Sequence, residues 1–322
     1  MMNIKTLFVA GFLMISATQY GQYTDIINSN RPGESMSAFS VGKTVIQAEA
    51  GLYGIKESHN LLNYDAKGFG TEIDVRYGAF FDQFEFTLNT QYQYDWYKSP
   101  SINDTRGGFK QITVGAKYLV YDPFIKEDKP NLYSWKANHS FSWKQFIPAV
   151  AVYAGINLKI GTNPFTFPTD RTISPKLMVI TQHHFGTKWV WVNNIIADKY
   201  MTDYPSLGII STMTRGFNMR WSGFLELQNF QSDYYADTIF RFGAAYLVLE
   251  NIQLDASLSK NVKDTPSLIM ANVGMAWRFD DNWETNYKRV GGGKSDKKDK
   301  KKKSKADKGK KRKDEVELEK TK

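Results

Sequence analysis

Long stretches in which apolar and polar residues alternate are the feature that most constrains the fold of this chain. In residues 83–95, Phe84, Phe86 and Leu88 alternate with polar residues, and residues 251–259 repeat the pattern. Successive side chains of a β-strand point to opposite faces, so a period of two indicates strands with one apolar and one polar face. In each alternating segment the charged residues fall on the polar face.

The alternating segments are numerous and long. Several have 11 residues or more, whereas strands of globular sheets have about 5–6 residues and strands that cross a bilayer need about 9–11. We expect about twelve strands, at residues 43–54, 69–79, 83–95, 109–121, 146–160, 173–185, 188–198, 206–215, 218–229, 237–248, 251–260 and 267–279.

The expected connections alternate in length. Short turns at residues 80–82, 186–187, 216–217 and 249–250 interleave with longer polar loops at 55–68, 97–108, 161–172, 199–205 and 230–236. Short periplasmic turns and long external loops are typical of outer-membrane barrels. We therefore predict an all-β fold, a transmembrane antiparallel β-barrel in the bacterial outer membrane. An even number of strands would leave both termini in the periplasm.

Residues 122–145 do not fit this rhythm, because they are long where a short turn is expected. Trp135 and Trp143 lie on one face of a helix-like pattern, with Lys136 and Lys144 beside them. One interpretation is an interfacial amphipathic segment against the inner leaflet. The alternative is a further hairpin, which would make a barrel of 14 strands.

The first 22 residues have the pattern of a signal peptide. Lys5 precedes an apolar run, residues 7–15, and small and polar residues follow up to Gln22. A run of this length is too short for a membrane-spanning helix, which needs about 20 residues. The chain has no cysteine, which excludes disulfides, thiolate metal sites and a cysteine nucleophile.

Nearly all of the net charge lies at the C-terminus. Residues 294–322 carry +8 of the formal net charge of +9. We expect residues 280–322 to form a linker and a disordered, lysine-rich periplasmic tail. After export, anionic lipid headgroups, the cell wall or an acidic outer-membrane or periplasmic protein are its possible partners, and no nucleic acid is expected.

Residues 23–42 precede the predicted barrel, which spans residues 43–279. This segment is a candidate plug or periplasmic latch, in which Arg31 and Glu34 form ion pairs with the walls of the lumen. A disordered leader is the alternative. A barrel of about twelve strands should leave a narrow lumen, because eight strands leave an interior filled by side chains and 16–18 leave a channel.

The charged residues on the polar faces are the candidate site. Both signs are mixed, so strong selectivity for anions or cations is not expected. They form either an ion-pair network that stiffens the barrel or a polar lining for solutes, and the two roles can coexist. The residues expected to line the lumen are Glu49, Glu72, Asp74, Arg76, Glu85, Lys117, Lys159, Arg220, Glu226, Arg241, Asp255 and Arg278.

No residue pattern indicates catalysis, a metal or a cofactor. His183 and His184 are adjacent on a predicted strand, so they point to opposite faces and cannot bind one metal together. No Ser/His/Asp arrangement can be assigned. We therefore expect that the protein is not an enzyme.

The last predicted strand alternates to an aromatic end, with Trp277 and Phe279 expected at the membrane interface. This resembles the C-terminal recognition signal of bacterial outer-membrane proteins. A more specific resemblance lies in residues 30–35, 39–43 and 45–52, which read NRPGES, FSVGK and VIQAEAGL. They resemble the opening of the outer-membrane transporter family named by analogy with the meta-pathway of phenol degradation. The resemblance implies a barrel that passes small molecules, apolar ones among them, although the basic tail departs from the family's pattern.

Two functions follow as hypotheses. The first is a barrel that passes or binds small solutes through a narrow polar lumen. The second is a structural subunit of a larger outer-membrane assembly that docks through residues 122–145 and the basic tail. A wide lumen would favour the first, and a plugged lumen with an exposed apolar or aromatic outer stripe would favour the second.

Overall fold

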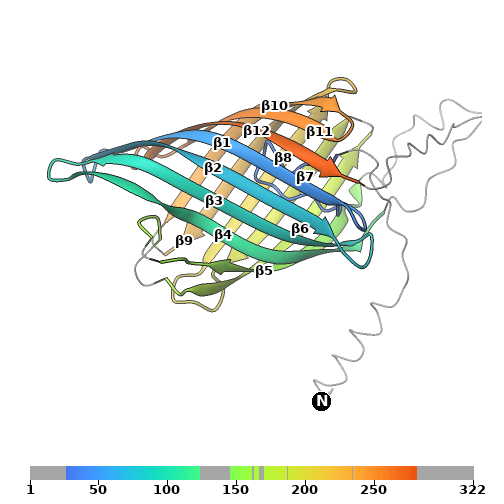
Figure 1. Ribbon diagram of the computed structural model, residues 1–322, viewed down its shortest axis with the longest axis horizontal. Helices are drawn as coiled ribbons and strands as arrows, with labels where there is room; N and C mark the ends of the chain where they lie inside the picture. Colours follow the sequence, from blue (N-terminus) through green and yellow to red (C-terminus); the bar gives the residue numbers. More distant parts are fainter. Residues whose placement is uncertain are drawn as a thin grey trace, which may run out of the picture. The chain divides into compact units, whose positions relative to one another are not determined.

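The described part of the chain is a closed β-barrel. The computed structural model describes residues 27–123, 146–161, 163–166, 170–186, 188–233 and 235–280. Within these residues, twelve strands pair antiparallel with their neighbours in sequence, and β12 pairs with β1 to close the ring (Figure 1). No helix in these ranges is long and apolar enough to cross a membrane.

The strands are long throughout. Their bounds are β1 Ile46–His59, β2 Tyr64–Gly78, β3 Phe84–Lys98, β4 Asn103–Tyr121, β5 Ala149–Leu158, β6 Ile173–Phe185, β7 Trp189–Asp198, β8 Ser206–Gly216, β9 Trp221–Ser232, β10 Ala236–Leu249, β11 Ile252–Asn261 and β12 Ser267–Phe279. The sequence predicted each of these strands, and the bounds of β6 and β12 agree with the prediction at both ends.

The number of strands in the ring decides between the two predicted barrels. β4 pairs directly with β5, so no further strand lies between them. The alternative of 14 strands is therefore wrong. The predicted interfacial tryptophans Trp135 and Trp143 lie outside the described residues, as do the predicted signal peptide and basic tail.

Two of the predicted long loops are mostly strand. β1 and β2 continue to a turn at residues 60–63, and β3 and β4 continue to a turn at residues 99–102. The sequence criterion missed these extensions because it required an apolar face. Beyond the apolar zone, both faces of these strands are polar. The backbone pairing between the strands nevertheless continues, for example where Ser58 pairs with Asp65.

The outward-facing side chains form an apolar belt. Large apolar residues are exposed on strands all around the ring, among them Leu52, Phe69, Ile73, Leu225, Phe242 and Val273. Along β2, the distance from Phe69 to Tyr77 is about 26 Å of strand at ~3.3 Å per residue. Since barrel strands are tilted by about 35–45°, this length spans roughly 20 Å across the membrane, within the ~25 Å apolar band of outer-membrane barrels.

Aromatic side chains mark the two edges of this belt. At the end of the barrel where β12 finishes, the rings of Trp277 and Phe279 lie 4.1 Å apart on the outer surface. Towards the other end, the ring of Trp96 lies 6.0 Å from Phe69 and 5.5 Å from Tyr94. Aromatic girdles at both interfaces are expected of a barrel in a bilayer.

The belt yields a test of how the barrel sits in lipid. Leu225 is 68% exposed on the outer face of β9. We expect Leu225→Arg to lower the free energy of unfolding in lipid vesicles by about 2–4 kcal/mol, the cost of arginine near the midplane. Urea titration followed by tryptophan fluorescence measures this. The control is Leu61→Arg, in the exposed β1–β2 turn, which should change little; equal effects would contradict the belt.

Candidate functional site

The interior of the barrel is crossed by its own N-terminal segment. Residues 27–45, which we call the inner segment, precede β1 and form no strand. Hydrogen bonds and ion pairs link this segment to β1–β4, β6 and β9–β11. Figure 1 shows it in blue within the ring, at the end where β1 begins and β12 finishes. The segment therefore spans the lumen from wall to wall.

Arg31 is the most buried charged residue of the inner segment, with 6% of its surface exposed. Its Nη1 lies 2.9 Å from Glu72, and its Nη2 lies 3.2 Å from Asp255. The backbone N–H of Arg31 donates to Glu49 at 3.1 Å, and its carbonyl accepts from Gln253 at 3.1 Å. Both the side chain and the backbone of this residue are thus held by the wall.

Glu34 binds the neighbouring part of the wall, on β9 and β10. Its carboxylate lies 2.8 Å from Nη1 of Arg241. The backbone N–H groups of Glu34 and Ser35 donate to Glu226 at 3.0 and 3.3 Å. Gly33 permits this approach, because a Cβ there would lie 2.5 Å from the Glu226 carboxylate.

A second group of wall charges uses the inner segment as its hydrogen-bond partner. Arg76 and Lys117 both pair with Glu85, at 3.0 and 2.8 Å, and all three are buried. Their remaining N–H groups donate to backbone carbonyls of the segment. Lys117 Nζ lies 2.6 Å from the Ser37 carbonyl, and Arg76 lies 3.2 Å from that of Phe39. A buried charge is tolerated only when paired and hydrogen-bonded, so the segment completes this network.

The remaining predicted lumen residues have different surroundings. Asp74 is half-buried and accepts a hydrogen bond from Asn89. Arg278 is buried, 3.6 Å from Asp280. Lys159 is half-buried just after β5.

Arg220 does not belong to the interior, contrary to the prediction. It is exposed in the β8–β9 turn, residues 217–220, and its guanidinium donates to the Tyr246 hydroxyl at 3.4 Å. The predicted strand began at residue 218, whereas β9 begins at Trp221. The alternation that places a side chain in the lumen therefore does not extend to Arg220.

The sequence did not indicate the apolar part of the interior. The inner faces of β5–β8 form a cluster with the inner segment's Met36, Ala38 and Phe39. Both faces of β6 and β7 are apolar there, which weakens the alternation that marks a lumen face. The wall residues of this cluster include Ala149, Ala151, Tyr153, Met178, Ile180, Val192, Ile196 and Ile210.

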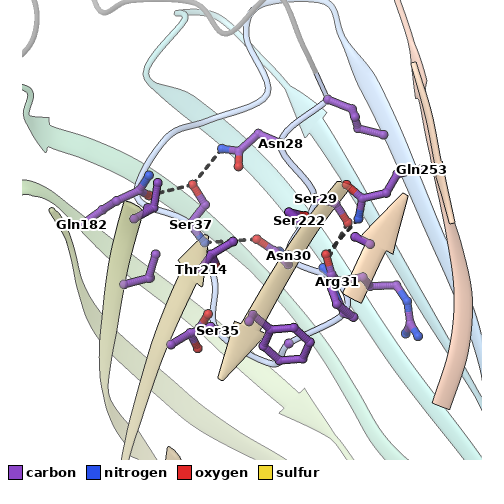
Figure 2. Close-up of a pocket in the computed structure, with 18 of the residues that line it drawn as sticks. Asn28, Ser29, Asn30, Arg31, Ser35, Ser37, Gln182, Thr214, Ser222 and Gln253 are labelled. Atoms are coloured by element: carbon purple, nitrogen blue, oxygen red, sulfur yellow. Dashed lines mark hydrogen bonds between the residues drawn. The ribbon is translucent and has the colours of Figure 1, made fainter. Parts of the chain in front are cut away.

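A cavity of about 690 Å³ remains between the inner segment and the strands β6–β11. Figure 2 shows Ser37 and Gln182 facing each other on one side of it, and Gln253 reaching Arg31 on the other. The cavity is lined mainly by uncharged hydroxyl, amide and apolar side chains, among them Ser29, Ser35, Thr214, Ser222, Val190, Val192 and Phe224.

The architecture just described coincides with a known family. The family model described as "Putative MetA-pathway of phenol degradation" matches residues 29–279. The chain belongs to this family. The match covers the inner segment from residue 29 and the whole barrel, and it confirms the resemblance inferred from residues 30–52. A search of the curated proteins found no match.

Solved structures resemble this one at low sequence identity. An outer membrane channel from Pseudomonas putida F1 has a TM-score of 0.53 and 11% identity, covering 79% of this chain and 100% of that one. The translocator domain of the autotransporter NalP from Neisseria meningitidis has a TM-score of 0.45 and 9% identity, covering 73% and 88%. The NanC porin has a TM-score of 0.46 and 9% identity, covering 71% and 98%. The first of these matches confirms the predicted transmembrane barrel.

Lys117 provides a test of the contact between this family member's wall and its inner segment. We expect Lys117→Met to destabilise the segment by about 1–3 kcal/mol, because buried carbonyls lose their donor. Trypsin should then cleave the folded barrel faster at Arg31 or Lys43, as measured by mass spectrometry. Lys56→Met, at an exposed position of β1, is the matched control. Equal cleavage rates would show that Lys117 does not hold the segment.

Proposed function

We propose that the protein is a bacterial outer-membrane channel for small solutes, closed by its inner segment in the state seen here. The observation that carries the proposal is the segment itself. It fills the lumen with residues that are not part of the barrel wall, and it is held there by ion pairs and hydrogen bonds. A lumen filled in this way can be emptied without unfolding a strand.

The barrel's size supports a path for solutes. Eight-stranded barrels are filled by their own side chains, and the twelve strands here enclose a wider ring that also holds residues 27–45. The cavity of about 690 Å³ lies within the ~300–1,000 Å³ range of small-molecule sites. Its lining is mainly uncharged polar and apolar, with Arg31 at one side, and suits small amphipathic molecules.

The turns support an orientation. β1 begins and β12 ends on the side of the β2–β3, β6–β7, β8–β9 and β10–β11 turns, which have two to five residues each, and of the one long connection on that side, residues 122–148 between β4 and β5. Since short turns face the periplasm in outer-membrane barrels, we place this end and the inner segment on the periplasmic side. The outer-membrane lipid covers the apolar belt.

The second hypothesis, a structural subunit of a larger assembly, is favoured by the filled lumen. A subunit that only docks needs no open path. The exposed apolar residues do not single out a docking stripe, however, because they occur on strands all around the barrel as a bilayer requires. Conductance measurements separate the two functions.

The chain has no cysteine, so a reducible cross-link between two introduced cysteines would form without competing thiols. The side chains of Ser37 and Gln182 meet at 3.0 Å. We expect the Ser37→Cys/Gln182→Cys protein in planar bilayers to carry intermittent single-channel current. A short, reducible bis-methanethiosulfonate cross-linker should abolish this current, and dithiothreitol should restore it.

The two single-cysteine proteins, treated in the same way, are the controls. Current that persists after verified cross-linking would show that the segment does not close the path. The absence of current in every state, including after reduction, would reject the channel and favour the structural subunit.

A further inference from the structure

The guanidinium of Arg31 lies against four wall residues, one on each of four adjacent strands. Gly51 on β1 pairs with Glu72 on β2 and with Gly274 on β12. Gly274 in turn pairs with Asp255 on β11. The wall thus presents a carboxylate, two glycines and a carboxylate at one level of the barrel. We call these four residues the socket.

The two glycines form a flat floor for the guanidinium. A Cβ at Gly51 would lie 2.5 Å from the Arg31 Cζ, and a Cβ at Gly274 would lie 2.6 Å from it. Real Cβ atoms do not approach another atom so closely, so a larger residue at either position would displace the guanidinium from this floor. A planar cation can lie on this floor, with a carboxylate at each edge to accept its N–H groups.

The negative charge of the socket's two carboxylates is offset in part by one cation, Arg31, which does not belong to the wall. Asp255 and Glu72 both lie within 3.2 Å of Arg31 nitrogens, and both are buried. Among the described residues, no lysine or arginine of the barrel strands lies within 4.0 Å of either carboxylate. If the inner segment left the lumen, the socket would expose two carboxylates to water without their guanidinium partner, and their paired negative charge would favour binding of another cation.

We propose that the socket is a binding site for a planar guanidinium or amidinium group carried by a solute, and that Arg31 occupies this site while the channel is closed. This inference rests on the proposed function, because it requires the segment to leave. A solute with such a group would compete with Arg31 for the same two carboxylates. Binding of the solute and release of the segment would then be one exchange reaction.

The test fills the socket of an Arg31→Ala protein with free guanidinium ion. We expect this protein, in detergent micelles, to unfold at a lower temperature than the wild type. Millimolar guanidinium chloride should raise its unfolding temperature by about 2–4 °C and then saturate, as a ligand of the folded state does. Urea, which has the same planar shape without the charge, and sodium chloride should not do so. The wild type, whose socket is occupied, should not respond to guanidinium.

Two variants keep the result specific. Arg31→Ala combined with Asp255→Asn removes one carboxylate and should lose the response. Arg171→Ala, which removes an exposed guanidinium, should show none. If the Arg31→Ala protein folds poorly, its refolding yield with guanidinium and with urea is the second measurement. A response equal for guanidinium and urea, or absent, overturns the proposal.

The outcomes separate this inference from the channel itself. Unfolding temperature and refolding yield do not depend on conduction. If guanidinium raises the unfolding temperature of a protein that never conducts, the proposed binding site is supported and the proposed channel function is contradicted. If the protein conducts but does not respond to guanidinium, the channel function is supported and the binding site is contradicted.

Discussion

The structure depends on the burial of charged side chains inside the barrel. Arg76, Glu85 and Lys117 are each no more than 1% exposed, and their mutual ion pairs leave N–H groups that need acceptors. The inner segment supplies them through its backbone carbonyls. In return, the wall carboxylates accept the segment's N–H groups. Because neither set of polar groups is satisfied alone, the barrel wall and the segment stabilise each other.

The segment is also matched to the two kinds of wall that it meets. Met36, Ala38 and Phe39 pack against the apolar inner faces of β5–β8, whereas Arg31 and Glu34 pair with charges on β2, β10 and β11. The lumen is therefore amphipathic. The inner segment binds the lumen as a ligand would, through its backbone groups, its apolar side chains and its charged side chains. This correspondence connects the closed state with the proposal that solutes use the same surfaces.

The strands could be predicted from sequence because the bilayer forces one face of each to be apolar. The prediction failed where the chain leaves the apolar zone, at the ends of β1–β4 next to the turns 60–63 and 99–102 and at Arg220. The charges of the site were visible in the sequence, but their pairing was not. Arg31 and Asp255 are 224 residues apart, and the Gly51–Gly274 floor exists only through the register of β1 and β12. These contacts depend on the register between paired strands and on the closure of the barrel, and the residue pattern of an individual strand does not reveal either.

Amide hydrogen exchange of residues 28–42 in lipid nanodiscs tests the central claim most directly, that the inner segment is held inside the folded barrel. The backbone N–H groups of Arg31, Glu34 and Val41 donate to buried carboxylates. The account predicts that these amides exchange orders of magnitude more slowly than in a free peptide of the same sequence. Exchange at the rate of the free peptide, while the strand amides stay protected, would contradict it.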